Sequence, residues 1–524
     1  MRRSTLPLFF LALTAAPISA QTRARAGEPA AAVRRAVETI TPADVQRRIG
    51  ILADDSMRGR LTPSPQLELA ASYIAGEFRR VGLRPGGDHG TFFQRYTIRR
   101  TQIDPASFAM VMGRGAHGHW ILGRDAALIA GAIPAAPISG PVVLMVGMPG
   151  DPAHPFGDVP LSGAIVLHVV PSRVRTSALL PTVARAAAAG ARGWIAVTDR
   201  NAGFFAQLVS RTRATRLELV GGAPEADATI PVVEVLGGSA ASVLAAAGED
   251  LAALRASTTP VVRALGGVTG TINLRRAVLS EQTAPNVIGI LEGSDPQLRG
   301  EYVFFTAHMD HIGTVADAYQ CRAAGADSTC NGADDDASGT TGVLELAEAF
   351  ATMSPRPRRS LVFMTVSGEE RGLWGSEYYS EHPTLPLANT VADLNIDMIG
   401  RNWRDTVVVI GKEHSSLGEV ANRVTAEHPE LNLQLVDDRW PGQRFYFRSD
   451  HYNFARKGVP ILFFFNGVHP DYHRATDSPD KIDAEKEARI IRMAFYIGLD
   501  VANTTARPQW NPESRRRIVE AAGN

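Results

Sequence analysis

The sequence predicts an α/β protein with a mixed, mostly parallel sheet sandwiched by helices and a smaller β-rich domain inserted into it. The first observation is an alternation of apolar strand-like and amphipathic helix-like segments from residue 264 onward, such as YVFFTAHMDH, GTTGVLELAEAF and SLVFMTVSGEE. Alternation of this kind favours parallel strands with helices on both faces. The second is a change of texture between 113 and 263, where short apolar strands such as LSGAIVLHVV and GARGWIAVTD follow one another.

These observations divide the chain into four parts. Residues 28–112 and 264–506 are expected to form the main domain, and 113–263 the inserted one. The last stretch, 507–524, is polar and is expected to be a peripheral tail. At 524 residues the chain is long enough for more than one domain.

The N-terminus has the layout of a secretory signal peptide. Arg2 and Arg3 precede an apolar segment that Pro17 interrupts, and small residues follow up to Ala20. This pattern predicts a signal peptide over residues 1–20 and export to the periplasm or the medium. The apolar run is too short to span a bilayer comfortably, so we expect no stable membrane insertion.

The charge balance limits the possible partners, and the cysteine content predicts a disulfide. Lysine plus arginine total 54 and aspartate plus glutamate total 54, a formal net charge of zero. This balance argues against a nucleic-acid or polybasic membrane partner. The two cysteines, Cys321 and Cys330, are expected to close a short loop as a disulfide in an oxidising compartment.

Chemically active side chains gather where predicted strands end, and in an open α/β sheet sites form at the carboxyl ends of strands. The candidates are His308 and Asp310 in FFTAHMDHIG, three aspartates in NGADDDASG, Glu369 and Glu370 in SGEE, Asp397 in LNIDMIG, and His473 in DYHRATD. Each motif is weak alone, and a lone HMD is more often a satisfied histidine. Their order and shared position make the set much stronger.

Adjacent carboxylates need a positive partner, because two buried like charges raise the free energy of the folded state. Imidazole and carboxylate ligands without a thiolate suit zinc, with manganese or cobalt as substitutes. The number of carboxylates exceeds what one zinc ion needs, which favours two ions sharing a bridging carboxylate. One of Glu369 and Glu370 could then bind metal while its neighbour acts as a general base.

The same motifs, with LADDSMRGRLT, FFQRY and PNVIGILEG, resemble the co-catalytic di-zinc aminopeptidases of the aminopeptidase Y and bacterial leucyl aminopeptidase type. Glutamate carboxypeptidases, the transferrin-receptor ectodomain and glutaminyl cyclases share that zinc exopeptidase fold. The inserted block resembles a protease-associated domain at the level of pattern only.

The resemblance implies a role for each candidate. The implied metal ligands are His308, Asp335 as the bridging carboxylate, Glu370, Asp397 and His473. The residues alone do not distinguish Asp335 from its two neighbours. Glu369 would be the general base and Asp310 would orient the His308 imidazole. Tyr472 would stabilise an oxyanion or simply pack as an aromatic, and Asp450 would help line the site. The resemblance also implies a strained, cis-prone Asp335–Asp336 bond.

The expected function is therefore that of an exported zinc aminopeptidase acting on peptides. A carboxypeptidase for acidic C-terminal residues is the alternative, and it would need Arg401, Arg439 or Arg448 to face the site. A single-zinc glutaminyl cyclase and a non-catalytic receptor-like ectodomain remain as weaker alternatives, because the set of ligands and base is complete.

Overall fold

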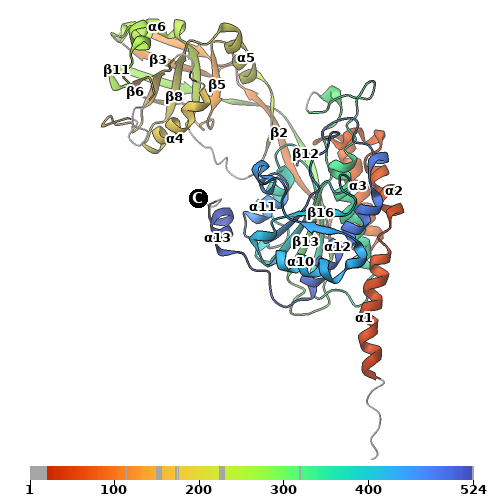
Figure 1. Cartoon of the computed structure of the whole chain (residues 1–524). Helices are drawn as coiled ribbons and strands as arrows, with labels where there is room; N and C mark the ends of the chain where they lie inside the picture. Colours follow the sequence, from red (N-terminus) through yellow and green to blue (C-terminus); the bar gives the residue numbers. More distant parts are fainter. Residues whose placement is uncertain are drawn as a thin grey trace, which may run out of the picture. The chain divides into compact units, whose positions relative to one another are not determined.

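The computed structural model describes residues 21–113, 115–148, 156–171, 174, 176–222, 230–317 and 320–521 (Figure 1). The predicted signal peptide, 1–20, lies outside the described residues. Within these ranges, no helix combines the length and the apolar character that a membrane crossing requires. The chain forms two compact units, one of Met1–Tyr96 with Ala284–Asn524 and one of Thr97–Thr283.

A mixed sheet forms the centre of the first unit, as the sequence predicted. Strands β13, β14, β15 and β18 run parallel to their neighbours in this group, whereas β12 and β16 join it antiparallel. In spatial order the strands are β17 (Gln434–Val436), β16 (Thr406–Ile410), β18 (Ile461–Phe464), β15 (Thr390–Ile396), β13 (Tyr302–His308), β14 (Ser360–Val366) and β12 (Arg276–Leu291), followed by β2 (Phe93–Ile103), with the short β1 (Arg84–Pro85) paired to β12.

Helices cover both faces of this sheet, because successive residues of a strand point to opposite sides. On β13, the ring of Phe305 lies 5.5 Å from that of Phe350 in α8, while the neighbouring Phe304 packs on Tyr379 of α9 and Phe454 of α11. The helices of the unit are α1 (Gln21–Glu38), α2 (Pro42–Leu52), α3 (Pro65–Arg80), α8 (Gly339–Ala351), α9 (Trp374–Glu381), α10 (Leu417–Glu427), α11 (His451–Ala455), α12 (Ala484–Asn503) and α13 (Pro512–Arg515).

The C-terminal stretch packs on the first unit up to residue 521. The Trp510 indole N–H donates to the carbonyl of Gly458 (2.8 Å). Ile518 is buried in an apolar cluster of this unit, and Trp510 packs against the same cluster. The predicted peripheral tail therefore contributes apolar contacts to this unit.

The second unit has its own eight-stranded sheet and core. The sheet order is β4 (Ala116–Ile121), β3 (Phe108–Gly113), β11 (Val261–Asn273), β6 (Ile138–Val146), β7 (Ile165–Val169), β8 (Gly193–Thr198), β10 (Val232–Leu236) and β5 (Ala126–Ala130). Strand β9 (Arg216–Leu219) also lies in this unit but pairs antiparallel with β2 and not with this sheet. The helices of the unit are α4 (Leu180–Ala188), α5 (Ala202–Arg213), α6 (Gly237–Ala246) and α7 (Leu251–Ala256).

This unit contains the predicted insertion, 113–263, and extends beyond it at both ends. The extension follows from strand pairing, because β3 hydrogen-bonds to both β4 and β11 within the same sheet. Its relation to protease-associated domains stays a prediction.

Candidate metal centre

Three neighbouring parallel strands deliver most of the predicted site residues to one edge of the main sheet. β13 ends at His308, the turn after β14 carries the two adjacent glutamates, and Asp397 directly follows β15. Asp335 lies in the turn that leads into α8, and His473 in the loop between β18 and α12. The carboxyl ends of parallel strands meet at the same edge, so residues far apart in sequence become neighbours.

The ligand-type atoms form two groups that share Asp335. His308 Nε2 lies 3.3 Å from Asp335 Oδ1 and 3.7 Å from Asp397 Oδ1. His473 Nε2 lies 3.3 Å from Asp335 Oδ2 and 3.2 Å from Glu370 Oε2. Asp335 thus presents one carboxylate oxygen to each histidine, which is the geometry of a bridging ligand.

The three consecutive aspartates have three different environments. The Asp336 carboxylate accepts hydrogen bonds from the backbone N–H groups of His308, Gly339 and Met398. Asp334 accepts one from the N–H of Gly400 (2.6 Å). Of the three aspartates, only Asp335 turns its two oxygens toward His308 and His473. The structure therefore identifies the aspartate that faces both histidines, which the sequence alone left open. The Asp335–Asp336 peptide bond is cis, which confirms the expectation drawn from the resemblance.

The residues present fit a metal ion. Asp335 Oδ2, Asp397 Oδ1 and His473 Nε2 are buried and have no hydrogen-bond partner among the described residues. Ligand atoms on a tetrahedral zinc ion, each at 2.0–2.1 Å, lie about 3.3 Å apart, close to the separations found here. Unpartnered buried polar atoms at this spacing raise the free energy of the folded state unless a cation lies between them.

The sequence analysis missed one histidine of the centre. His311 is fully buried, and its Nδ1 lies 2.8 Å from Glu370 Oε1 and 3.7 Å from Asp335 Oδ2. Same-face spacing along a strand singled out His308 and Asp310, but β13 ends at His308, so the period of two does not extend to His311. The second histidine in HMDH was the available signal.

Hydrogen bonds fix the two predicted ligand imidazoles. His308 Nδ1 lies 3.1 Å from the backbone carbonyl oxygen of Asp310, and the nearer Asp310 carboxylate oxygen is 3.7 Å away. That carboxylate accepts from the Thr62 hydroxyl (2.7 Å) and from the Glu369 N–H (3.3 Å). Asp310 therefore positions the ring through its main chain and anchors the turn that carries Glu369.

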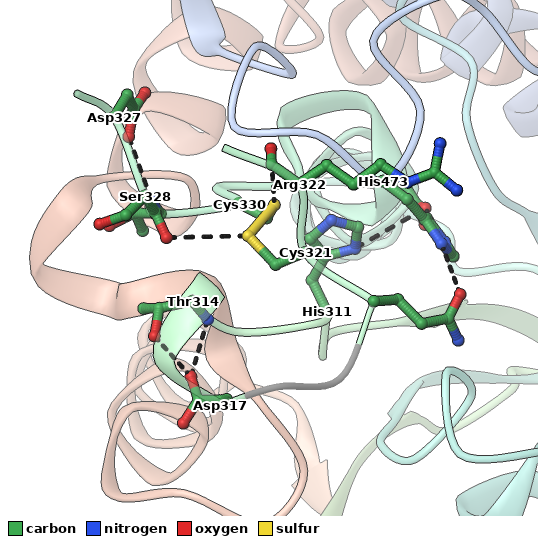
Figure 2. The surroundings of a disulfide bond; sticks show 12 residues. His311, Thr314, Asp317, Cys321, Arg322, Asp327, Ser328, Cys330 and His473 are labelled. Atoms are coloured by element: carbon green, nitrogen blue, oxygen red, sulfur yellow. Dashed lines mark hydrogen bonds and ion pairs between the residues drawn. A yellow bond between two sulfur atoms is a disulfide. The ribbon is translucent and has the colours of Figure 1, made fainter. Parts of the chain in front are cut away.

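A disulfide-closed loop supports the other imidazole. Cys321 and Cys330 are bonded, with Cα atoms 5.7 Å apart, which confirms the predicted disulfide. The bonded pair and His473 are shown in Figure 2. Gln320, which precedes Cys321, has its Oε1 2.9 Å from His473 Nδ1. The N–H of Ala475 also donates to the Arg322 carbonyl (3.0 Å), so the two loops are joined at His473 and again two residues after it.

The local electrostatics reflect this concentration of charge. Burial alone would favour the neutral acid at Asp335, but the imidazoles of His311, His308 and His473 hold its pKa well below the usual range. Burial raises the pKa of Glu369 well above its ordinary value, and neighbouring carboxylates such as Glu370 add to this. The two carboxyl groups thus differ strongly in proton affinity.

A small pocket opens onto the His308 side of the centre. Its polar floor includes His308, Asp335, Glu369 and Asp397. The remaining lining residues are Met398, Phe445, Arg448, Ser449, Phe463, Phe465, Val468 and Tyr472.

The arginines that a carboxypeptidase would need have different locations. Arg448 lines the pocket, with its guanidinium 4.7 Å from the centre of the Phe445 ring. Arg401 is paired with Asp471 (2.8 Å), and Arg439 lies over the ring of Trp403. Of the three, Arg448 is the one among the lining residues.

Two further predicted residues differ in placement. Tyr472 lines the pocket and stacks on the His473 ring, with centroids 3.8 Å apart. Asp450 is fully buried and accepts a hydrogen bond from the Ser376 hydroxyl (2.5 Å), and its neighbours Arg448 and Ser449 line the pocket.

A buried arginine joins the segments that carry the ligands. The Arg60 guanidinium donates to the carbonyl oxygens of Leu52, Met309, Asn331 and Gly332. Met309 follows His308, and Gly332 precedes the triple aspartate. Arg60 thus fixes two ligand-bearing loops and adds a positive charge beside the carboxylates.

Comparison with known proteins connects this centre to a family. Residues 286–497 match peptidase family M28. A probable zinc metalloprotease of Pyricularia oryzae is 28% identical over 269 residues, covering 43% of this chain and 50% of the relative. Another, of Leptosphaeria maculans, is 35% identical over 205 residues, covering 34% and 45%. The chain spans about half the length of these curated relatives.

Solved structures similar to this chain include zinc aminopeptidases. The aminopeptidase from Aneurinibacillus sp. strain AM-1 is 18% identical with a TM-score of 0.47, covering 91% of this chain and 97% of that chain. The zinc aminopeptidase from Bacillus subtilis is 19% identical with a TM-score of 0.44, covering 89% and 97%.

Replacing Arg60 by methionine should destabilise the first unit by about 3 kcal/mol or more, since four carbonyl groups lose their donor and the carboxylates lose a buried cation. Denaturant unfolding of the full chain measures this. The exposed Arg58, exchanged for lysine, is the matched control and should unfold like the parent. An unchanged unfolding midpoint for Arg60→Met would contradict the structural role.

Proposed function

We propose that this chain, in which residues 286–497 belong to peptidase family M28, is an exported zinc-dependent aminopeptidase that removes N-terminal residues from peptides. The observation that carries the proposal is the pair of ligand groups sharing Asp335, beside a pocket that contains Glu369. The printed names of the curated relatives, probable zinc metalloproteases, support zinc and a peptidase reaction.

The ligand groups would hold two zinc ions, or manganese or cobalt in their place. His308, Asp335 and Asp397 would hold one, and Asp335, Glu370 and His473 the other. When bound, such ions polarise a peptide carbonyl and lower the pKa of a water molecule toward neutrality.

Glu369 is the proposed general base. A water that attacks a peptide carbonyl must lose a proton, and the departing amine must gain one. Glu369 lines the pocket beside His308, and its backbone N–H is held by the Asp310 carboxylate. It can therefore accept the proton and return it without leaving its position. Tyr472, which also lines the pocket, would donate to the developing oxyanion.

The pocket favours an aminopeptidase. Glu369 and Asp397 provide carboxyl oxygens that could accept hydrogen bonds from a protonated α-amino group. The aromatic and aliphatic walls, including Phe463, Phe465 and Val468, suit a large apolar first side chain. Arg448 supports a second candidate, a carboxypeptidase, because its guanidinium could bind a free carboxylate.

Export rests on the N-terminal pattern of residues 1–20 and is consistent with the disulfide. Disulfides persist in the periplasm and outside the cell, where reducing systems do not act on them.

Matched peptides with free or acetylated N-termini test the reaction. The protein should release the first residue from free-amine peptides only, fastest when that residue is large and apolar such as leucine or phenylalanine. A zinc chelator should abolish release. Chromatography of the products with and without chelator measures all three expectations.

Chelator-sensitive release of C-terminal residues from acetylated peptides would instead establish the carboxypeptidase. Arg448→Met would then lower the affinity for the substrate carboxylate. Failure to cleave either series by a zinc-bound protein would refute the proposed reaction.

Replacing Glu369 by glutamine should lower kcat by at least about a hundredfold, because an amide cannot accept the proton. Zinc content should stay near that of the parent, since Glu369 is not a proposed ligand. Steady-state kinetics and elemental analysis of the same preparation provide the two readouts. Loss of zinc together with activity would show that Glu369 is structural.

Replacing Gln320 by alanine should weaken binding of the zinc ion at the His473 position about 10- to 100-fold if His473 is a ligand, because the imidazole loses the partner of its Nδ1. Gln320→Glu keeps an acceptor oxygen and is the control. Chelator titration of zinc-loaded protein measures the affinity. Equal affinities for the alanine and glutamate variants would remove Gln320 from the centre.

A further inference from the structure

We propose that His311 is a further metal ligand of this centre, binding through Nδ1 the ion that Asp335, Glu370 and His473 would hold. The inference rests on the proposed zinc peptidase and adds a residue to its metal site. It starts from the position of the ring. His311 is fully buried, and its Nδ1 is within 2.8 Å of Glu370 Oε1 and 3.7 Å of Asp335 Oδ2.

The orientation of the imidazole favours coordination over a simple hydrogen bond. Although Nδ1 is close to the Glu370 carboxylate, neither ring nitrogen of His311 makes a hydrogen bond of acceptable geometry with any described residue. The same nitrogen thus faces oxygens of two carboxylates, Glu370 and Asp335, and not one of them alone. His473 Nε2 behaves in the same way, 3.2 Å from Glu370 and without a hydrogen bond. Nitrogens that point beside neighbouring oxygens are expected where both atoms face one cation.

The backbone is built to admit this ring. Gly332 has a φ of 59°, and a Cβ placed on it would collide with the His311 ring and the Asp335 carbonyl. The backbone N–H of His311 donates to the Arg60 carbonyl (3.4 Å), which holds the residue beside the ligand loops. A glycine in left-handed conformation is thus required where the ring approaches the turn that carries Asp335.

A second imidazole makes the two positions of the centre unequal. The rings of His311 and His473 meet edge to face, with centroids 5.7 Å apart. Two imidazoles at the tetrahedral angle on one zinc ion, each with its centroid about 3.2 Å from the ion, lie about 5.2 Å apart, close to this separation. One position would then have two nitrogen and two oxygen donors, and the His308 position one nitrogen and two oxygens. We therefore expect the ion beside His311 to be the more tightly held.

Two isosteric substitutions distinguish a ligand from a hydrogen-bond donor. Because Nδ1 faces the carboxylates, the δ atoms of aspartate and asparagine occupy the same place along the side chain. His311→Asp supplies a ligand oxygen without a donor, and His311→Asn supplies an N–H donor but a poor ligand. The zinc-loaded full chain is dialysed against a competing chelator, and bound zinc is counted by elemental analysis.

Coordination predicts that His311→Asp keeps about two zinc ions per chain, whereas His311→Asn binds the more tightly held ion at least about tenfold more weakly. The reverse pattern would assign His311 as a donor that orients Glu370 and overturn the proposal. Unchanged binding by both variants would overturn it as well.

X-ray absorption of the zinc-loaded wild type gives an answer that needs no substitution. Scattering from imidazole counts histidine ligands, and the proposal predicts three imidazoles per two zinc ions. Two imidazoles per two ions would overturn it, including where both variants lose metal or fail to fold.

Reference variants separate this inference from the proposed function. His308→Ala and His473→Ala should each lower zinc content. If neither does, the proposed centre itself fails. If both do and the protein cleaves peptides, but absorption finds two imidazoles, only the role of His311 fails.

Discussion

A dense group of buried carboxylates at one edge of the main sheet is the constraint on which the rest of the structure depends. Asp310, Asp335, Asp336 and Asp397 are almost completely removed from water, and Asp477 is fully buried near them. A buried carboxylate is stable only with positive charge or hydrogen-bond donors around it. Much of the surrounding architecture supplies one or the other.

Backbone amides and a buried arginine satisfy part of this demand and thereby leave one carboxylate available. The Asp477 carboxylate accepts from the N–H groups of Asp334 and Asp335, while Asp336 accepts from three other amides. These bonds set the shape of the turn, and Arg60 holds the preceding segment through its carbonyls. The shape directs Asp335 toward the histidines, so its availability for a metal is a property of the surrounding loops.

Sequence reasoning reached the elements that follow periodic or motif rules. The mixed sheet, the disulfide and the strand-end acids and histidines each leave a local pattern, so they were predicted before the fold was known. Arg60 and Gln320 show no sign of their contacts in the local sequence, and His311 leaves only the second histidine of HMDH. Arg60 donates to backbone carbonyl groups, which every residue possesses. Gln320 is 153 positions from His473 in sequence, and the fold of its loop brings the two together. His311 lies just past the end of the strand whose spacing identified His308 and Asp310. The choice among three aspartates likewise depends on hydrogen bonds from distant residues.

The two sides of the centre differ in their access to substrate. His308, Glu369 and Asp397 line the pocket, whereas Glu370, His311 and His473 are not among its lining residues. His473 instead lies beside the disulfide-closed loop (Figure 2), and its Nδ1 is 2.9 Å from Gln320 Oε1. Metal sites that protein ligands close tend to be structural, and sites with an open position tend to be catalytic. An ion on the His308 side would therefore face the peptide, while one beside His473 would chiefly fix the bridging Asp335 and offset the carboxylate charge.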